Sequence, residues 1–378
     1  MRALHFLLML RPSHTTRARI RIVLSLAAAG AATAAAAQTS LGPSEDATVA
    51  PPGVVRARLG NAWATYYENL EQGSIAAHGY VQVRYTTLSA ELGVLPGLSL
   101  TFVAPEAGTL AATEWTSNYG FQVDSFVNTS HNGIGDIEVG AKFAWLRGPG
   151  EFERLALTGA HVRSSLSGSW RFPTGTGEYP EVPFDVGTGS LRAAATVASQ
   201  TDLMIGRVFW ITAAGRYIMP QAATVPVLVH PPGLPLSNIY GVMDAQVSGG
   251  NSYVLEATPR AALGPYFMIG GQYQYLNRAA SSYVGTKTDT IAGVPVVVDA
   301  STLNAGTAAT AQTLSAFVTF STVASYLERA SGFPVEVSYQ HIWTVSATGA
   351  APPAEITDVV TIRLWARLWG GWKPKPQK

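Results

Sequence analysis

The side chains of this 378-residue chain that could do chemistry recur at every second position of long segments. Between residues 136 and 146, the charged Asp136, Glu138 and Lys142 alternate with apolar residues such as Val139 and Phe143. A period of two is the pattern of a β-strand with one polar and one apolar face. Several segments share it, and the charged candidates for a common polar surface are Asp136, Glu138, Lys142, His161, Arg163, Arg171, Arg192, Arg216, Glu336, Arg363 and Arg367.

Catalytic and cofactor sites find little support in the same residues. His161 and Ser165 lie on one predicted face, but no third polar group is placed to orient the histidine, as a nucleophilic site requires. The histidines have no metal-site spacing, and the chain has no cysteine for a thiolate zinc site. The glycine pairs near Gly133 precede no helix and no Gly-Lys-Ser/Thr, so they are not phosphate loops. We therefore predict no enzymatic activity, no metal and no cofactor.

The first 37 residues have the features of a secretory signal. Arg17, Arg19 and Arg21 precede the apolar run from Ile22 to Ala37, which ends in three alanines. A membrane anchor is the alternative, but the run is mostly alanine and lacks the large apolar residues that a stable span needs. We expect cleavage near Ala37 and export to the outer membrane of a Gram-negative bacterium.

The composition is unusual for a soluble domain. Charged residues make up 13% of the chain, about half the usual share. After the signal no run of 18 apolar residues offers a helical span. A chain that crosses a membrane without helices must form a closed barrel, because only then are all backbone groups hydrogen-bonded within lipid. The net charge of +1 gives no basis for a nucleic-acid partner.

Twelve segments are predicted to be strands, and the connections between them fall into two classes. The segments are 54–67, 79–92, 98–105, 133–146, 154–172, 190–202, 205–219, 251–259, 264–278, 312–326, 333–346 and 357–369. Short connections alternate with long ones at 106–132, 173–189, 220–250 and 279–311. Short periplasmic turns and long external loops are typical of outer-membrane barrels, and the length of 154–172 favours strands that cross a bilayer obliquely.

The predicted fold class is therefore all-β: a transmembrane, antiparallel, up-and-down β-barrel of about twelve strands, with 10 or 14 as alternatives. The barrel is expected to occupy residues 54–369, after a flexible lead-in at 38–53 and before a periplasmic tail at 370–378. The long connections 220–250 and 279–311 are apolar. We expect them to form short hairpins above the membrane or to fold inward, as a collecting surface for apolar compounds or as a contact patch for a partner.

Four short motifs resemble one known family. Gly133–Phe143 resembles the Gly-x-Gly-Asp strand of the outer-membrane proteins named for the MetA pathway of phenol degradation. Phe172–Gly175 is similar to that family's Pro-Thr-Gly at the lip of an external loop, and Asp185–Ser190 to its returning Gly-x-Gly element. Gly93–Leu100 is similar to its strand–turn–strand opening, with Leu95 and Pro96 in place of polar turn residues. The resemblance covers roughly residues 80–220 and implies a transporter-like barrel that passes small hydrophobic or aromatic compounds.

Two functions remain open. An unpaired charge that faces lipid costs about 2–4 kcal/mol at the bilayer midplane, so the candidate charges are predicted to line the lumen. In the first hypothesis, arginines such as Arg163 and Arg363 form with the acidic candidates a polar constriction that selects small solutes. In the second, ion pairs fill the lumen of a structural barrel whose loops bind a surface partner or a second copy. The width of about twelve strands favours the first, a passive channel surrounded by outer-membrane lipid.

Overall fold

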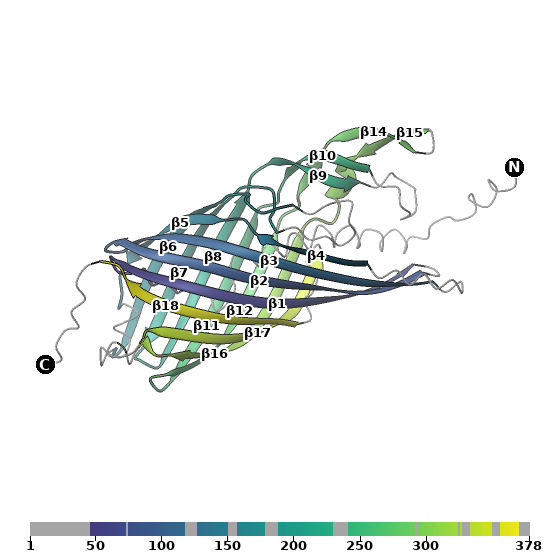
Figure 1. The fold of residues 1–378 in the computed structure, drawn as a ribbon. Helices are drawn as coiled ribbons and strands as arrows, with labels where there is room; N and C mark the ends of the chain where they lie inside the picture. Colours follow the sequence, from purple (N-terminus) through teal and green to yellow (C-terminus); the bar gives the residue numbers. More distant parts are fainter. Residues whose placement is uncertain are drawn as a thin grey trace.

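The computed structural model describes residues 46–72, 75–117, 127–149, 157–177, 188–229, 241–291, 294–323, 326, 333–349 and 356–369. These residues form a closed antiparallel barrel of twelve strands, as predicted (Figure 1). Its strands are β1 (Val54–Gln72), β2 (Ile75–Leu95), β3 (Leu98–Ser117), β5 (Glu138–Leu146), β6 (Ala160–Arg171), β7 (Ala194–Ile205), β8 (Phe209–Pro220), β11 (Ser252–Leu263), β12 (Phe267–Arg278), β16 (Ala309–Ser321), β17 (Val335–Gly349) and β18 (Ile356–Arg367). Each strand pairs with the next in this order, and β1 pairs with β18 to close the sheet.

The two ends of the barrel differ in their connections. Tight connections join β2 to β3, β7 to β8 and β11 to β12 at one end, where β1 also begins opposite the end of β18. We call this the turn end, and the opposite end, with the long connections, the loop end. The first residue of β1 and the last residue of β18 therefore both lie at the turn end, as an even number of up-and-down strands requires.

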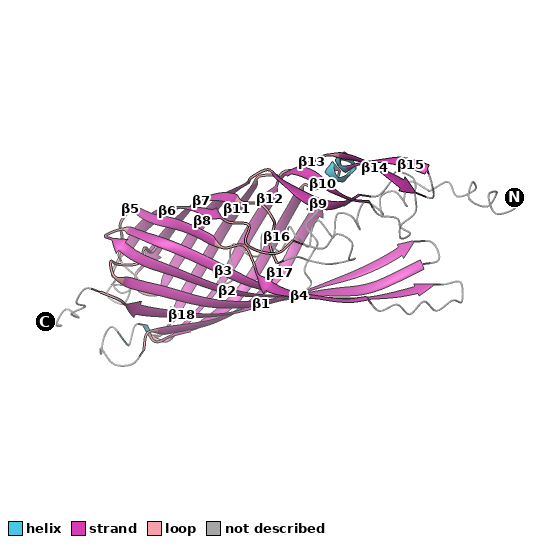
Figure 2. Cartoon of the chain, turned by 45° about the horizontal axis from the view of Figure 1, so that its top comes forward, coloured by secondary structure: helices cyan, strands magenta, loops and turns pink. Residues whose placement is uncertain are grey.

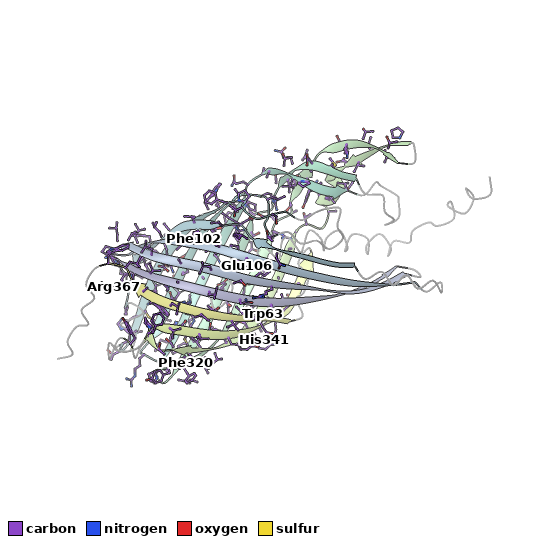
Figure 3. All side chains as sticks on the ribbon, viewed as in Figure 1. Trp63, Phe102, Glu106, Phe320, His341 and Arg367 are labelled. Carbon is purple, nitrogen blue, oxygen red and sulfur yellow. The ribbon has the colours of Figure 1, made fainter. Side chains whose placement is uncertain are left out.

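The outer face of the wall is apolar. Phe102 of β3 and Phe320 of β16 are exposed, as are large apolar side chains on the other strands. Figure 3 shows Phe102 and Phe320 between Arg367, at the turn end, and the level of Trp63, Glu106 and His341. An exposed apolar band with aromatic and charged residues at its margins is the surface that a lipid-spanning barrel presents. The described part of the chain contains no helix long and apolar enough to cross a membrane.

Some strand lengths differ from the prediction. Strands β1, β2 and β3 have 19, 21 and 20 residues. With β4 (Val127–Ile134) they extend beyond the barrel (Figure 2), so the long connection predicted at 106–132 is largely strand. The strand predicted at 154–172 is shorter than expected. Among the described residues of this segment, only 160–171 form β6. The argument from strand length therefore holds for β1–β3 and was wrong for that segment.

The apolar connections at the loop end form a small structure of their own. Strands β9 (Ala223–Val229), β10 (Gly241–Ser248) and β13 (Ser282–Val284) make a three-stranded sheet. Strands β14 (Thr286–Ile291) and β15 (Val294–Asp299) make a hairpin, which a 3-10 helix at Ala300–Asn304 follows. Their buried apolar side chains pack together in a core of Val229, Met243, Ala245, Val247, Val298 and Ala300, which we call the loop core. The expected short hairpins are present, and much of their apolar character is buried in this core.

Residues 1–45 and 370–378 lie outside the described residues, and with them the predicted signal segment, the tail and the first part of the lead-in.

Candidate functional site

Residues 46–53, which we call the inner lead-in, lie inside the turn end of the barrel. The backbone N–H of Ala47 donates to Asp202 Oδ2 on β7 at 3.1 Å, and that of Ala50 to Glu91 Oε1 on β2 at 2.8 Å. Both alanines are buried. Strands β2 and β7 are four places apart around the sheet, so this segment connects parts of the wall that are not neighbours.

The carboxylate of Asp46 anchors the segment among cations. Its Oδ1 lies 3.3 Å from Arg56 Nη1, and its Oδ2 lies 3.9 Å from Arg163 Nη2. Its backbone carbonyl accepts a hydrogen bond of 2.6 Å from Lys142 Nζ. Burial alone would raise the pKa of Asp46, but the cations, Arg56 first, hold that pKa well below its usual range. The anchor is therefore ionised at neutral pH.

The same cations also bind acids of the wall. Arg56 pairs with Glu91 on the adjacent strand, and Arg163 Nε donates to Asp202 Oδ2 at 2.6 Å. Asp202 is fully buried and also accepts from Thr212 Oγ1 on β8 at 2.7 Å. A buried carboxylate with several donors is satisfied in its charged form. The turn end thus has a polar network on several strands that the inner lead-in connects.

Three further ion pairs among the described residues run along the wall. They are Glu336–Arg363 between β17 and β18 (3.1 Å), Glu138–Arg171 between β5 and β6 (3.7 Å), and Arg216–Glu256 between β8 and β11. Each joins adjacent strands. Amides extend the third pair, because Gln274 Nε2 donates to Glu256 Oε1 at 2.8 Å and Gln272 Nε2 to Glu256 Oε2 at 3.3 Å. These groups coat the wall and do not connect opposite sides.

Two apolar clusters flank the inner lead-in at the turn end. One contains Leu157, Met204, Trp210 and Met268, and the other contains Val54, Val323 and Trp365. Leu157 and Val323 come from connections between strands, so these connections contribute side chains to the barrel interior. Arg260 lies over the Trp210 ring, 5.8 Å from its centroid, and Arg363 lies over Trp365 at 5.9 Å. The cations thus bind aromatic faces as well as acids.

At the loop end, three of the motifs converge on Asp136. Its Oδ1 accepts from the backbone N–H of Gly175 at 3.1 Å, and its Oδ2 accepts from the N–H and hydroxyl of Ser190 at 2.8 and 2.7 Å. Thr174 Oγ1 donates to the carbonyl of Gly135, and Thr188 Oγ1 to that of Ile134. Residues 135–137 therefore leave the strand, which separates β4 from β5 where one continuous strand was predicted.

The predicted site residues thus separate into four groups. Lys142 and Arg163 meet at the inner lead-in, and Glu138, Arg171, Arg216, Glu336 and Arg363 form pairs along the wall. Asp136 organises the loop end, and Arg192 lies nearby, just before β7. His161 Nε2 bonds the carbonyl of Thr158 at 2.8 Å, and the exposed Arg367 donates to the carbonyl of Trp369. The last two belong to the turn-end rim.

The candidates did not include Glu256 of the wall or four charged participants around the inner lead-in: Asp46, Arg56, Glu91 and Asp202. The last three lie in predicted strands, and alternation could have identified Asp202, which is two residues from Gln200 on the polar face of β7. Asp46 had no such signal, because its neighbours show no periodicity. Among the described residues, no group of three or more His, Asp or Glu is placed to hold a metal ion.

No protein-family model matches the chain, and no curated protein matches its sequence. Solved structures are similar to it in fold. The crystal structure of an outer membrane channel from Pseudomonas putida F1 matches with a TM-score of 0.53 and 10% identity, over 86% of this chain and 100% of that one. The TodX monoaromatic hydrocarbon channel (TM-score 0.42, 8% identity, 85% and 91% covered) and the transport unit of the autotransporter AIDA-I from Escherichia coli (0.40, 9%, 90% and 97%) are more distant. The resemblance to the phenol-degradation family stays a prediction, and what the first match shows is the fold, a β-barrel like that of an outer-membrane channel.

Proposed function

We propose that this chain is a passive conduit of the bacterial outer membrane for small molecules with hydrophobic or aromatic bodies. The observation that carries the proposal is the direction of the ion pairs. Glu336–Arg363, Glu138–Arg171 and Arg216–Glu256 each join neighbouring strands. A network that filled the lumen would join opposite strands, whereas pairs along the wall satisfy the charges and leave the axis to other groups.

The inner lead-in is the constriction in this proposal. It crosses from Glu91 to Asp202 at the turn end and is anchored through Asp46 to Arg56 and Arg163. A solute that enters at the loop end meets this segment last. In this proposal the groups that select solutes are Arg163 and its neighbours, as in the first sequence hypothesis. In addition, Arg163 binds the Asp46 carboxylate of the inner lead-in. Export, with cleavage near Ala37, is part of the same proposal.

Reconstitution of the refolded chain in planar bilayers and liposomes tests the conduit. We expect discrete conductance steps and uptake of small aromatic compounds. Arg163→Ala removes a guanidinium that binds both Asp46 and Asp202, so the inner lead-in loses an anchor and conductance rises several-fold. Arg363 pairs with Glu336 at the wall, so Arg363→Ala should change conductance less than Arg163→Ala.

Arg207→Ala is the matched control, because Arg207 lies in the exposed turn between β7 and β8, outside the lumen. Its conductance should equal that of the parent chain. Absence of both conductance and aromatic uptake in correctly folded protein contradicts the conduit and leaves a structural barrel. Equal conductance in the Arg163 variant and in the parent chain removes Arg163 from the constriction.

A further inference from the structure

Two arginines at the loop end have no carboxylate partner among the described residues, whereas Arg171, Arg216 and Arg363 each have one. Arg192 lies two residues before Ala194, which is buried on the inner face of β7, and Arg278 ends β12 in phase with the buried Gln272. Strand alternation directs Arg278 toward the lumen, and Arg192, in the bend before β7, has its buried Nη1 beside Gly249, which lies between β10 and β11. Arg278 Nη2 donates to the carbonyl of Thr307 at 3.4 Å, and within the part of the chain that the structure describes neither guanidinium pairs with a carboxylate.

The two guanidiniums are also incompletely hydrogen-bonded. Arg192 Nη1 and Arg278 Nε are buried and have no hydrogen-bond partner among the described residues. The two guanidiniums lie in the same part of the loop end, because Gly249, beside Arg192 Nη1, is three residues before Ser252, which is opposite Arg278. Burial lowers the pKa of Arg192, and Tyr283 and Asp136 counteract it. Half-buried cations with buried, unused donors favour an anionic ligand, because a buried donor without a partner is unfavourable.

Among the described residues, Asp136 is an acid whose charge acts on Arg192, but its oxygens already have other donors. They accept hydrogen bonds from Gly175 and Ser190. The arginines of the middle lumen differ, since Arg216 is paired with Glu256 and Arg171 with Glu138. Arg192 and Arg278 thus differ from these arginines in having no carboxylate partner among the described residues.

Apolar side chains lie next to this pair. Ser252 of β11 is opposite both Ile218 of β8 and Arg278 of β12, so Ile218 and Arg278 lie at the same level of the wall. One step further in, Val254 is opposite Leu276. Ile218 and Val254 are buried on the inner face, and Leu276 is half-buried. The loop end therefore combines two cationic heads with an apolar strip directly below them.

We propose that Arg192 and Arg278 bind the carboxylate of a small organic acid whose aromatic or aliphatic body packs on the strip of Ile218, Val254 and Leu276. Guanidinium groups match carboxylates in geometry and charge, and the apolar strip adds affinity that an inorganic anion cannot gain. This site deepens the proposed conduit, on which it rests, by assigning it organic carboxylates in preference to neutral compounds of the same shape.

Binding to the folded full-length chain in detergent tests the site without any need for conduction. Benzoate, benzyl alcohol and chloride serve as probes in calorimetric titrations. We expect benzoate to bind more tightly than benzyl alcohol, and Arg192→Gln and Arg278→Gln each to weaken benzoate about tenfold, as the loss of a charge-assisted hydrogen bond predicts. Arg84→Gln is the control, because Arg84 is exposed on β2 opposite Trp63, on the outer face. Heat-modifiable migration on gels confirms that each variant is folded.

Three outcomes would overturn the site: equal binding of benzoate and benzyl alcohol, displacement of benzoate by an equal concentration of chloride, or an equal loss in the Arg84 variant. Bilayer recordings under a benzoate gradient separate the site from the conduit. Conductance with no preference for benzoate over the neutral analogue contradicts the site alone. Benzoate binding in a barrel that never conducts contradicts the conduit alone.

Discussion

At the scale of single residues, three of the short motifs meet at one carboxylate, that of Asp136. Asp136 is 2% exposed, and three donors from two later segments bind its oxygens. The glycines beside it are required because backbones meet there. A Cβ on Gly189 would lie 2.5 Å from Asp136 Oδ1 and 2.7 Å from the Cα of Gly175. The motif sequence therefore encodes a packing arrangement at the rim of the lumen.

Replacement of Gly189 by alanine tests that arrangement. We expect Gly189→Ala to destabilise the folded barrel by about 1–3 kcal/mol, the usual cost of an overpacked site, because neither the Asp136 carboxylate nor the Gly175 backbone can move freely. The measurement is the temperature at which the folded band on a gel converts to the unfolded band. Gly168→Ala is the control, since a Cβ there has no neighbour closer than 3.9 Å. Equal transition temperatures for the two variants would contradict the account.

At the scale of elements, the strands could be predicted and the inner lead-in could not. Alternation is a local signal, so segments such as 136–146 show their polar and apolar faces without reference to other parts of the chain. The lead-in, which was expected to be flexible, has no periodicity. The position of residues 46–53 depends on Glu91, Asp202 and Lys142, which are 41 to 155 residues away in the chain. Contacts at such separation leave no pattern in the local sequence.

The interruption at 135–137 was missed for a related reason. Asp136 alternates correctly with its neighbours, so the pattern predicts a continuous strand and an inward carboxylate. Donors from Gly175 and Ser190 stabilise a different local path, and they lie 39 and 54 residues further on. For residues on regular strands, such as Arg163 and Glu336, alternation indicates which face of the strand each side chain is on. Their partners required the order of strands around the closed sheet.

The inner lead-in makes an element-scale prediction about conductance. Asp46→Asn keeps the size of the side chain but removes the charge that Arg56 and Arg163 bind, so the segment is held less firmly and single-channel conductance rises several-fold. Asp244→Asn, on the exposed face of β10, is the control. In the parent chain the pKa of Asp46 is lowered, so its contribution is present above the ordinary aspartate range and is lost only as pH falls through the lowered value. Conductance of the Asp46 variant equal to that of the control would mean that the segment is held by other contacts.

At the scale of the whole molecule, the charge distribution and the apolar band both indicate a barrel that spans lipid. Among the described residues, charged side chains lie in the lumen and toward the two ends of the barrel, and the outward face between the ends is apolar. On β3 the outward residues run from Leu98 through Phe102 to Glu106, where the first exposed carboxylate appears. The same level on β1 and β17 carries Trp63 and His341 (Figure 3). This level is therefore the expected boundary between lipid tails and headgroups on the loop side.

Arginine substitutions on β3 test that placement in the membrane. Phe102→Arg puts a cation near the centre of the apolar band and should destabilise the barrel in lipid vesicles by about 2–4 kcal/mol, whereas Glu106→Arg at the boundary should cost about 0–1 kcal/mol. Both side chains point outward from one strand, so they differ mainly in depth. Reversible unfolding by denaturant in vesicles measures both. In detergent micelles, which deform around a charge, the difference should shrink. For a soluble barrel the cost of each substitution would be the same in vesicles and in micelles, because its outer face would already be in water. Equal costs of the two substitutions in vesicles would place the lipid boundary away from the Trp63 level.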